Sequence, residues 1–107
     1  MSKPPKIIKL GYHDIEFSVS SELPDGTTGH YSQNHRMLVV SKDQSPQDQV
    51  NTLFHEVVHV AWDLAKLEGS DEHEERVASV LGNLLTEFVS RNPGLLRWMQ
   101  ERLNESD

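Results

Sequence analysis

Two histidines and a glutamate stand close together near the middle of the chain, in the order His55-Glu56-x-x-His59. Residues four apart share one face of a helix, with Cβ atoms about 5–6 Å apart. At that separation two imidazoles can bind one tetrahedral Zn²⁺ with bonds of about 2.0–2.1 Å. Glu56 points to one side of the pair, where it could accept a proton from a metal-bound water. The spacing therefore predicts a catalytic zinc site with His55 and His59 as ligands and Glu56 as general base.

The residues around this motif favour a helix with one buried face. Its apolar side chains recur at helical spacing along one stripe: Val50, Leu53, Phe54, Val57, Ala61, Leu64 and Ala65. At about 100° per residue, His55 and His59 fall roughly opposite this stripe. A helix of this kind can pack in the core on one side and form the floor of a cleft on the other.

The start of this helix is well marked. Ser45 can cap it, Pro46 suits the first helical position, and Asp48 places an acidic group in the first turn. We expect the helix to continue to about Leu67 and to be ended by Gly69.

Two further helices should follow. Asp71 and Glu74 have the spacing of a capping box, so a second helix should begin there and stop before Pro93. A short third helix should run from Gly94 to about Leu103. We expect the large apolar side chains of the helical half to lie in the core or between helices: Trp62, Val77, Val80, Leu81, Leu84, Leu85, Phe88, Leu95, Leu96, Trp98 and Met99.

The sequence pattern of the front half of the chain predicts two β-hairpins. The first pairs Lys6–Leu10 with Ile15–Val19, and the second pairs Gly29–Ser32 with Met37–Val40. Strands followed by helices are typical of an α+β protein. The predicted fold is a small, mainly antiparallel β-sheet followed by three helices.

Two histidines do not complete a catalytic zinc site, which usually has three protein ligands. Asp63 lies one turn beyond His59 and nearly in line with the histidines. We therefore expect it on the surface, or in contact with a metal ligand and not with the metal itself. The start of the second helix is better placed, because an antiparallel helix returns toward the first. It offers a group of ionisable side chains: Asp71, Glu72, His73, Glu74 and Glu75. Glu74 lies near the apolar stripe of that helix and Glu75 off it, so periodicity leaves the choice open.

Composition narrows the class of protein. With 107 residues the chain is long enough for one domain, residues 1–107, with residues 1–5 as a tail that has no reason to be ordered. A net charge of −7 disfavours nucleic acid as a partner. The absence of cysteine excludes disulfides and thiolate metal ligands. No signal peptide or membrane-length apolar run is visible, which indicates a cytoplasmic protein. The oligomeric state is not indicated.

One family resemblance narrows the third ligand. The run Glu75-Arg76-Val77-Ala78-Ser79-Val80-Leu81-Gly82-Asn83-Leu84-Leu85 resembles the glutamate helix of the gluzincins. Glu75 and Ala78 also match the shorter pattern of the ImmA/IrrE metallopeptidases, particularly their small phage and prophage members. The resemblance covers roughly residues 29–93. It implies a minimal zincin-like metalloprotease fold, one Zn²⁺ per chain and Glu75 as third ligand, rather than Glu74 or Glu72.

The same resemblance implies an activity, a zinc-dependent metallopeptidase that hydrolyses a protein or peptide. Similar enzymes add a Tyr or His that stabilises the oxyanion, and the candidates here are His30, Tyr31, His35 and His73. An edge strand, Gly29–Ser32 or Met37–Val40, would bind the substrate as an added strand. The alternative is a binding or regulatory protein of weak or absent activity on the same scaffold; a purely structural metal domain is a third possibility. The intact Glu56 favours the enzyme, and the small size of the chain favours the binding protein.

Overall fold

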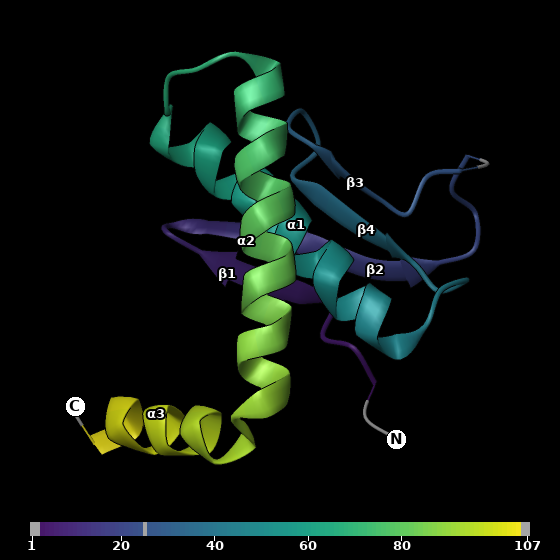
Figure 1. Cartoon of the computed structure of the whole chain (residues 1–107). Coiled ribbons are helices and arrows are strands. Elements are labelled where there is room, and N and C mark those ends of the chain that lie inside the picture. The colour runs from purple at the N-terminus through teal and green to yellow at the C-terminus, as the bar shows by residue number, and fades with distance from the viewer. Residues whose placement is uncertain (1–2, 25, 106–107) are drawn as a thin grey trace.

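The computed structural model of the protein describes residues 3–24 and 26–105. Four strands come first: β1 (Ile7–Leu10), β2 (His13–Ser20), β3 (Gly29–Ser32) and β4 (Met37–Ser41). Three helices follow: α1 (Pro46–Ala65), α2 (Asp71–Arg91) and α3 (Pro93–Glu105) (Figure 1). This order confirms the predicted α+β class. Residues 3–5 of the predicted tail carry no regular secondary structure, and residues 1–2 lie outside the described residues.

The four strands form one mixed sheet in the order β1-β2-β4-β3. Both predicted hairpins are present: β1 pairs with β2 and β3 pairs with β4, each antiparallel. The sequence did not predict how the hairpins join, which is a parallel pairing of β2 with β4 that sets Val19 opposite Val40. As a result, β3 is an edge strand and β4 lies between two others. Of the two strands expected to bind substrate, β3 has an unpaired edge and β4 does not.

The core lies between the sheet and α1. Ile15, Leu38 and Val40 of the sheet and Val60 of α1 are buried, and partly buried apolar side chains pack around them. Among these are three members of the predicted stripe, Leu53, Val57 and Leu64. Val60 was not assigned to that stripe, and Val50 at its start is exposed. The buried face of α1 is therefore rotated slightly toward Val60 and Glu56.

The N-cap of α1 is the one predicted, whereas that of α2 lies one residue before the predicted Asp71. The side chain of Ser45 accepts a hydrogen bond from the backbone N–H of Asp48, and Ser70 does the same for His73 at the start of α2. Lys66 ends α1 in the left-handed conformation, three residues before the expected Gly69. After a short connection, α2 begins with the acidic turn 71–75 and folds back across α1 (Figure 1).

The predicted packing of α2 and α3 is correct only in part, because Val77 and Leu85 of α2 and Leu95 and Met99 of α3 are half-buried. Ala78, Gly82 and Thr86 are the buried residues of α2, whereas the other large side chains of the predicted stripe are exposed: Val80, Leu81, Leu84 and Phe88. The reason is that α2 packs against α1 and not against the sheet, and a close approach of two helices requires small side chains. The C-terminal part of α2 and all of α3 extend beyond the sheet (Figure 1), so Leu96 and Trp98 are exposed as well.

No helix within residues 3–24 and 26–105 is both long enough and apolar enough to cross a membrane.

Candidate metal centre

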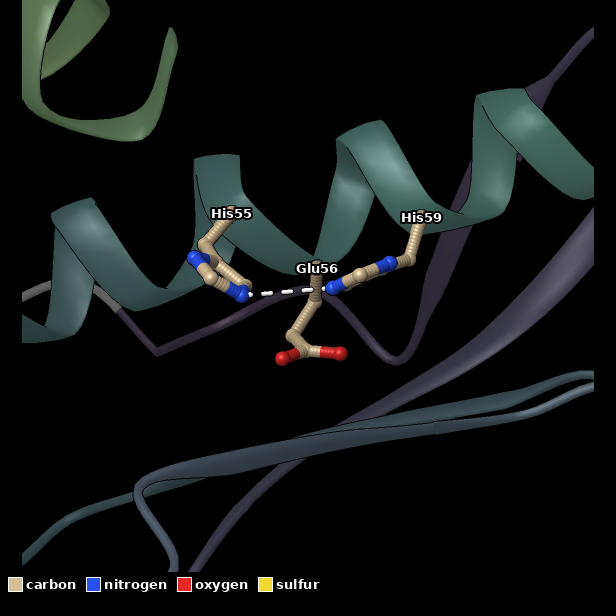
Figure 2. A group of neighbouring side chains, drawn as sticks. All are labelled: His55, Glu56 and His59. Atoms are coloured by element: carbon tan, nitrogen blue, oxygen red, sulfur yellow. Dashed lines mark hydrogen bonds between the residues drawn. The ribbon is translucent and has the colours of Figure 1, made fainter. Parts of the chain in front are cut away.

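His55, Glu56 and His59 lie together on one side of α1 (Figure 2). The Nε2 atoms of the two histidines face one another at 3.2 Å, and their ring centroids are 5.0 Å apart. The three residues can each offer a ligand atom within 4.8 Å of the others. The i, i+4 spacing therefore produces the convergence that the sequence predicted.

Glu75 brings a carboxylate from α2 to the same point. Its Oε1 atom lies 2.7 Å from Nε2 of His55, and its Oε2 atom lies 3.0 Å from Nε2 of His59. Two ring nitrogens and one carboxylate thus enclose a small space. In a tetrahedral zinc site with bonds of about 2.0–2.1 Å, neighbouring ligand atoms are separated by about 3.3–3.4 Å. The three donors fit Zn²⁺ in type, and their separations of 2.7, 3.0 and 3.2 Å are about 0.1–0.7 Å shorter than the required spacing.

Glu74 contacts the opposite side of the His59 ring, with its Oε2 atom 2.6 Å from Nδ1. If Nδ1 carries the proton and donates to this carboxylate, the lone pair of Nε2 faces Glu75 and His55. Carboxylates commonly hold metal-binding histidines in this way. Burial alone would lower the pKa of His59, but the hydrogen bond to Glu74 and the charges of Glu56 and Glu75 outweigh it and raise that pKa.

Glu56 has a different environment from the other carboxylates. It is only 9% exposed and, among the described residues, makes no hydrogen bond or ion pair. Its side chain points from α1 toward the sheet (Figure 2). Burial raises the pKa of Glu56, while the neighbouring histidines act to lower it. A carboxylate with a raised pKa and a free oxygen suits the acceptance of a proton.

Gly29 on β3 allows the edge strand to approach Glu56 this closely. A Cβ atom at this position would lie 2.5 Å from Cγ2 of Thr52 and 3.3 Å from Cγ of Glu56. Any other residue here would require Thr52 or β3 to shift. Gly29 was not predicted as a site residue; a glycine at the start of a predicted strand is the signal that could have indicated it.

The site opens into two hollows that share Gly29, Glu56 and His59. The first, here called the main cleft, has a volume of about 600 Å³ and extends toward the start of α1, past Thr52 to Asp48. The second, here called the β3 hollow, has a volume of about 330 Å³ and extends past His30 and Tyr31 to Glu74. Together they run along β3 on both sides of Glu56.

The residues considered for oxyanion stabilisation are placed differently. Of the four candidates, His30 and Tyr31 line the β3 hollow, and His35 and His73 do not. The hydroxyl of Tyr31 donates to Oδ2 of Asp63 at 3.0 Å, so it is engaged one turn away from the cluster. His73 packs edge-on against Trp62, and His35 is exposed in the β3–β4 turn. Burial, followed by the contact with Asp63, raises the pKa of Tyr31.

Two further contacts fix α2 against α1 at the height of the site. The side-chain amide of Asn51 donates to Oδ1 of Asn83 at 2.6 Å. A Cβ on Gly82 would lie 2.8 Å from Oδ1 of Asn51 and 3.4 Å from Cβ of His55. Gly82 lies two helical turns beyond Glu75, so the close approach that it permits brings Glu75 to the histidines. Neither contact was predicted from the sequence.

Comparison with known proteins corrects the family resemblance. No family model matches the chain, and no curated protein matches it. A solved structure described as a Mycobacterium tuberculosis transcriptional regulator is similar over 67% of this chain, with 20% identity and a TM-score of 0.48. The match covers 24% of that structure, so the chain spans about a quarter of its length. A likeness of this size supports no argument about function.

The predicted membership of the ImmA/IrrE metallopeptidases, with its gluzincin class and phage or prophage origin, is therefore wrong by these comparisons. The resemblance depended on one short motif and on an amphipathic helix pattern that many unrelated helices share. His55-Glu56-x-x-His59 by itself is not evidence of protease activity. The geometry of the cluster stands independently of any family.

Proposed function

We propose that the protein is a zinc-dependent hydrolase that cleaves peptide bonds in a protein or peptide substrate. One observation carries the proposal: the Nε2 atoms of His55 and His59 and the carboxylate of Glu75 converge on one point beside Glu56. Glu56 is buried and has no hydrogen-bond partner in the part of the chain that the structure describes. A structural metal site has no need of such a carboxylate. The donors are of the types that Zn²⁺ prefers.

Each residue would have a distinct role. His55, His59 and Glu75 would hold the ion, and Glu74 would keep the His59 ring in the tautomer that binds. When bound, Zn²⁺ polarises a carbonyl group and makes water more acidic. Glu56 would accept the proton of the attacking water and pass it to the leaving amine.

The edge of β3 supports a peptide as the substrate. Gly29, His30 and Tyr31 lie on this strand and line the hollows beside Glu56. An extended peptide could pair with the free backbone groups of β3 and pass the cluster in the cleft. The carboxylates of the site disfavour a polyphosphate chain in the same position.

A binding protein without turnover is the second candidate. It is favoured by the exposure of Glu75, whose side chain is 57% accessible, because catalytic sites usually exclude water from around the ion. This candidate predicts the same metal binding and the same peptide binding but no cleavage.

The experiment compares zinc-loaded wild type with Glu56→Gln on a mixed peptide library, with products detected by mass spectrometry. We expect cleavage by wild type and none by Glu56→Gln at equal zinc content, because an amide cannot accept the proton. Glu101→Gln, on the exposed helix α3, is the matched control and should cleave normally. An absence of Glu56-dependent cleavage would replace the hydrolase by the binding protein.

A further inference from the structure

The lining of the main cleft and the β3 hollow carries negative charge in excess of what the metal would neutralise. Its carboxylates are Asp48, Glu56, Glu74 and Glu75. Among the described residues, no lysine or arginine lines either hollow. Four carboxylates outweigh the two positive charges of one Zn²⁺, so the cleft stays negative when the ion is bound.

Two of these carboxylates have no hydrogen-bond or ion-pair partner within residues 3–24 and 26–105. Glu56 is nine-tenths buried and lines both hollows. The carboxylate of Asp48 makes no hydrogen bond or ion pair with any residue in the described part of the chain; only its backbone N–H is bonded, to Ser45. Burial of the Glu56 charge favours a cation nearby, whereas Asp48 is exposed, so its charge is accessible to a ligand in the cleft.

Asp48 lies at a useful distance from the reacting centre. It precedes His55 by seven residues, which is two helical turns, so both side chains lie on the same side of α1. At a rise of 1.5 Å per residue the two positions are about 10.5 Å apart along the helix. An extended peptide covers this distance in about three residues. A lysine or arginine one or two residues from the cleaved bond could therefore bring its charge to Asp48.

The other walls of the main cleft do not favour an apolar side chain. Between Asp48 and the histidines they consist of small or polar residues, including Thr28, Gln44, Asn51 and Thr52. Gln44 is already bonded, with its amide donating to the carbonyl of Ser41 and its oxygen accepting from Thr52. No large apolar side chain lines this cleft, within the residues described.

We propose that the main cleft selects peptides with a lysine or arginine on the side of the cleaved bond that faces the start of α1, and that Asp48 determines this preference. The inference depends on the proposed peptide-binding function and names its substrate class. Asp48 also stands in the first turn of α1, where an acidic group stabilises a helix whatever its surroundings. The test must separate these two roles.

The probes are three alanine-rich peptides of equal length that carry Lys, Leu or Glu at the central position. They are titrated into the zinc-loaded Glu56→Gln variant, which cannot turn them over. We expect the Lys peptide to bind roughly fivefold to tenfold more tightly than the Leu peptide, which corresponds to about 1–1.4 kcal/mol. The Glu peptide should bind most weakly, and the Lys preference should shrink as salt is raised.

Asp48→Asn in the same background should remove most of the preference. Asp71→Asn is the matched control, because Asp71 occupies the first turn of α2 but lines neither hollow. It should leave the preference unchanged. Urea unfolding of both variants shows whether a change in binding reflects only a weaker helix, since both lose the same helix-start charge.

The outcomes of the two proposals are distinguishable. Equal binding of the Lys and Leu peptides, no effect of Asp48→Asn, or no binding of any probe overturns the inference about selection. If wild type still cleaves library peptides, the hydrolase proposal survives that result. A Lys preference that depends on Asp48, without any cleavage by wild type, supports the selection and overturns the hydrolysis.

Discussion

The Oε2 atom of Glu74 lies 2.6 Å from Nδ1 of His59, whereas the carboxylate of the next residue, Glu75, lies 3.0 Å from Nε2 of the same ring. Two consecutive glutamates thus contact the two nitrogens of one imidazole. Periodicity could not decide between them as the third ligand, and the structure gives each a different contact. Glu72, the third possibility, lies 3.8 Å from Arg76, and its side chain is 86% exposed.

These contacts predict a ranking of zinc affinities. Glu75→Gln should weaken zinc binding most, because it replaces the charged group that faces both Nε2 atoms. Glu74→Gln should weaken it by about 10–100-fold, as losses of an outer-shell partner generally do. Competition with a chelating dye measures all the variants.

Glu72→Gln serves as the matched control for charge on the same helical turn and should bind zinc like wild type. If Glu74→Gln lost more affinity than Glu75→Gln, the ligand would be Glu74 and the assignment here would be reversed.

The part of the site that could be predicted from sequence is the part whose residues lie close together along the chain. His55, Glu56 and His59 are tied by the geometry of one helix, so their spacing alone predicts that they converge. Glu75 comes from another helix, and a resemblance that the comparisons do not support was needed to select it from its neighbours. Its position depends on packing at Gly82, which no local pattern reveals.

The fold shows the same division between local and distant effects. The two hairpins and the cap at Ser45 depend on neighbouring residues, and they were predicted correctly. The parallel pairing of β2 with β4 depends on how two hairpins dock. The apolar stripe around Leu84 suggested burial, but the small residues Ala78 and Gly82 were the ones needed between α1 and α2.

The close packing at Gly82 is itself testable. Gly82→Leu should lower the free energy of unfolding by about 1–3 kcal/mol, a common cost of overpacking. It should also weaken zinc binding, because separation of the helices would move Glu75 away from His55. Gly94→Leu is the matched control, since a Cβ at Gly94 meets nothing within 4 Å. Unchanged zinc affinity in a folded Gly82→Leu variant would show that Gly82 does not position Glu75.

The contact between Tyr31 and Asp63 predicts a change in stability at alkaline pH. Burial and the hydrogen bond to Asp63 raise the pKa of Tyr31 in the folded protein. The folded state then holds the phenolic proton more tightly than the unfolded state does. Its contribution to stability is fully present below the ordinary tyrosine pKa of about 10, and it is lost as pH rises through the higher folded value.

The variant Tyr12→Phe leaves Tyr31 as the sole tyrosine, so its tyrosinate absorbance can be followed directly. Asp63→Asn in this background should lower the pKa of Tyr31 and reduce the loss of stability with pH. A pKa that does not change with Asp63→Asn would mean that the hydrogen bond does not hold β3 against α1.

The stability of the whole fold should respond to zinc without depending on it. Ile15, Leu38, Val40 and Val60 form a core between the sheet and α1 that does not involve the metal site, so the metal-free protein should remain folded. Binding only to the folded state adds about 2.7 kcal/mol at a free zinc concentration of 100 times Kd. For a domain of this size about 1 kcal/mol corresponds to 4–8 °C in Tm, so saturating zinc should raise Tm by about 10 °C or more.

Thermal unfolding with and without zinc checks this prediction. Addition of a chelator should reverse the shift in Tm, and metal analysis should give one Zn²⁺ per chain. His35→Gln, which removes an exposed histidine of the β3–β4 turn, should behave like wild type, whereas His55→Gln should lose the response. Equal Tm values with and without zinc would rule out the metal centre, and with it the proposed catalytic role of Glu56.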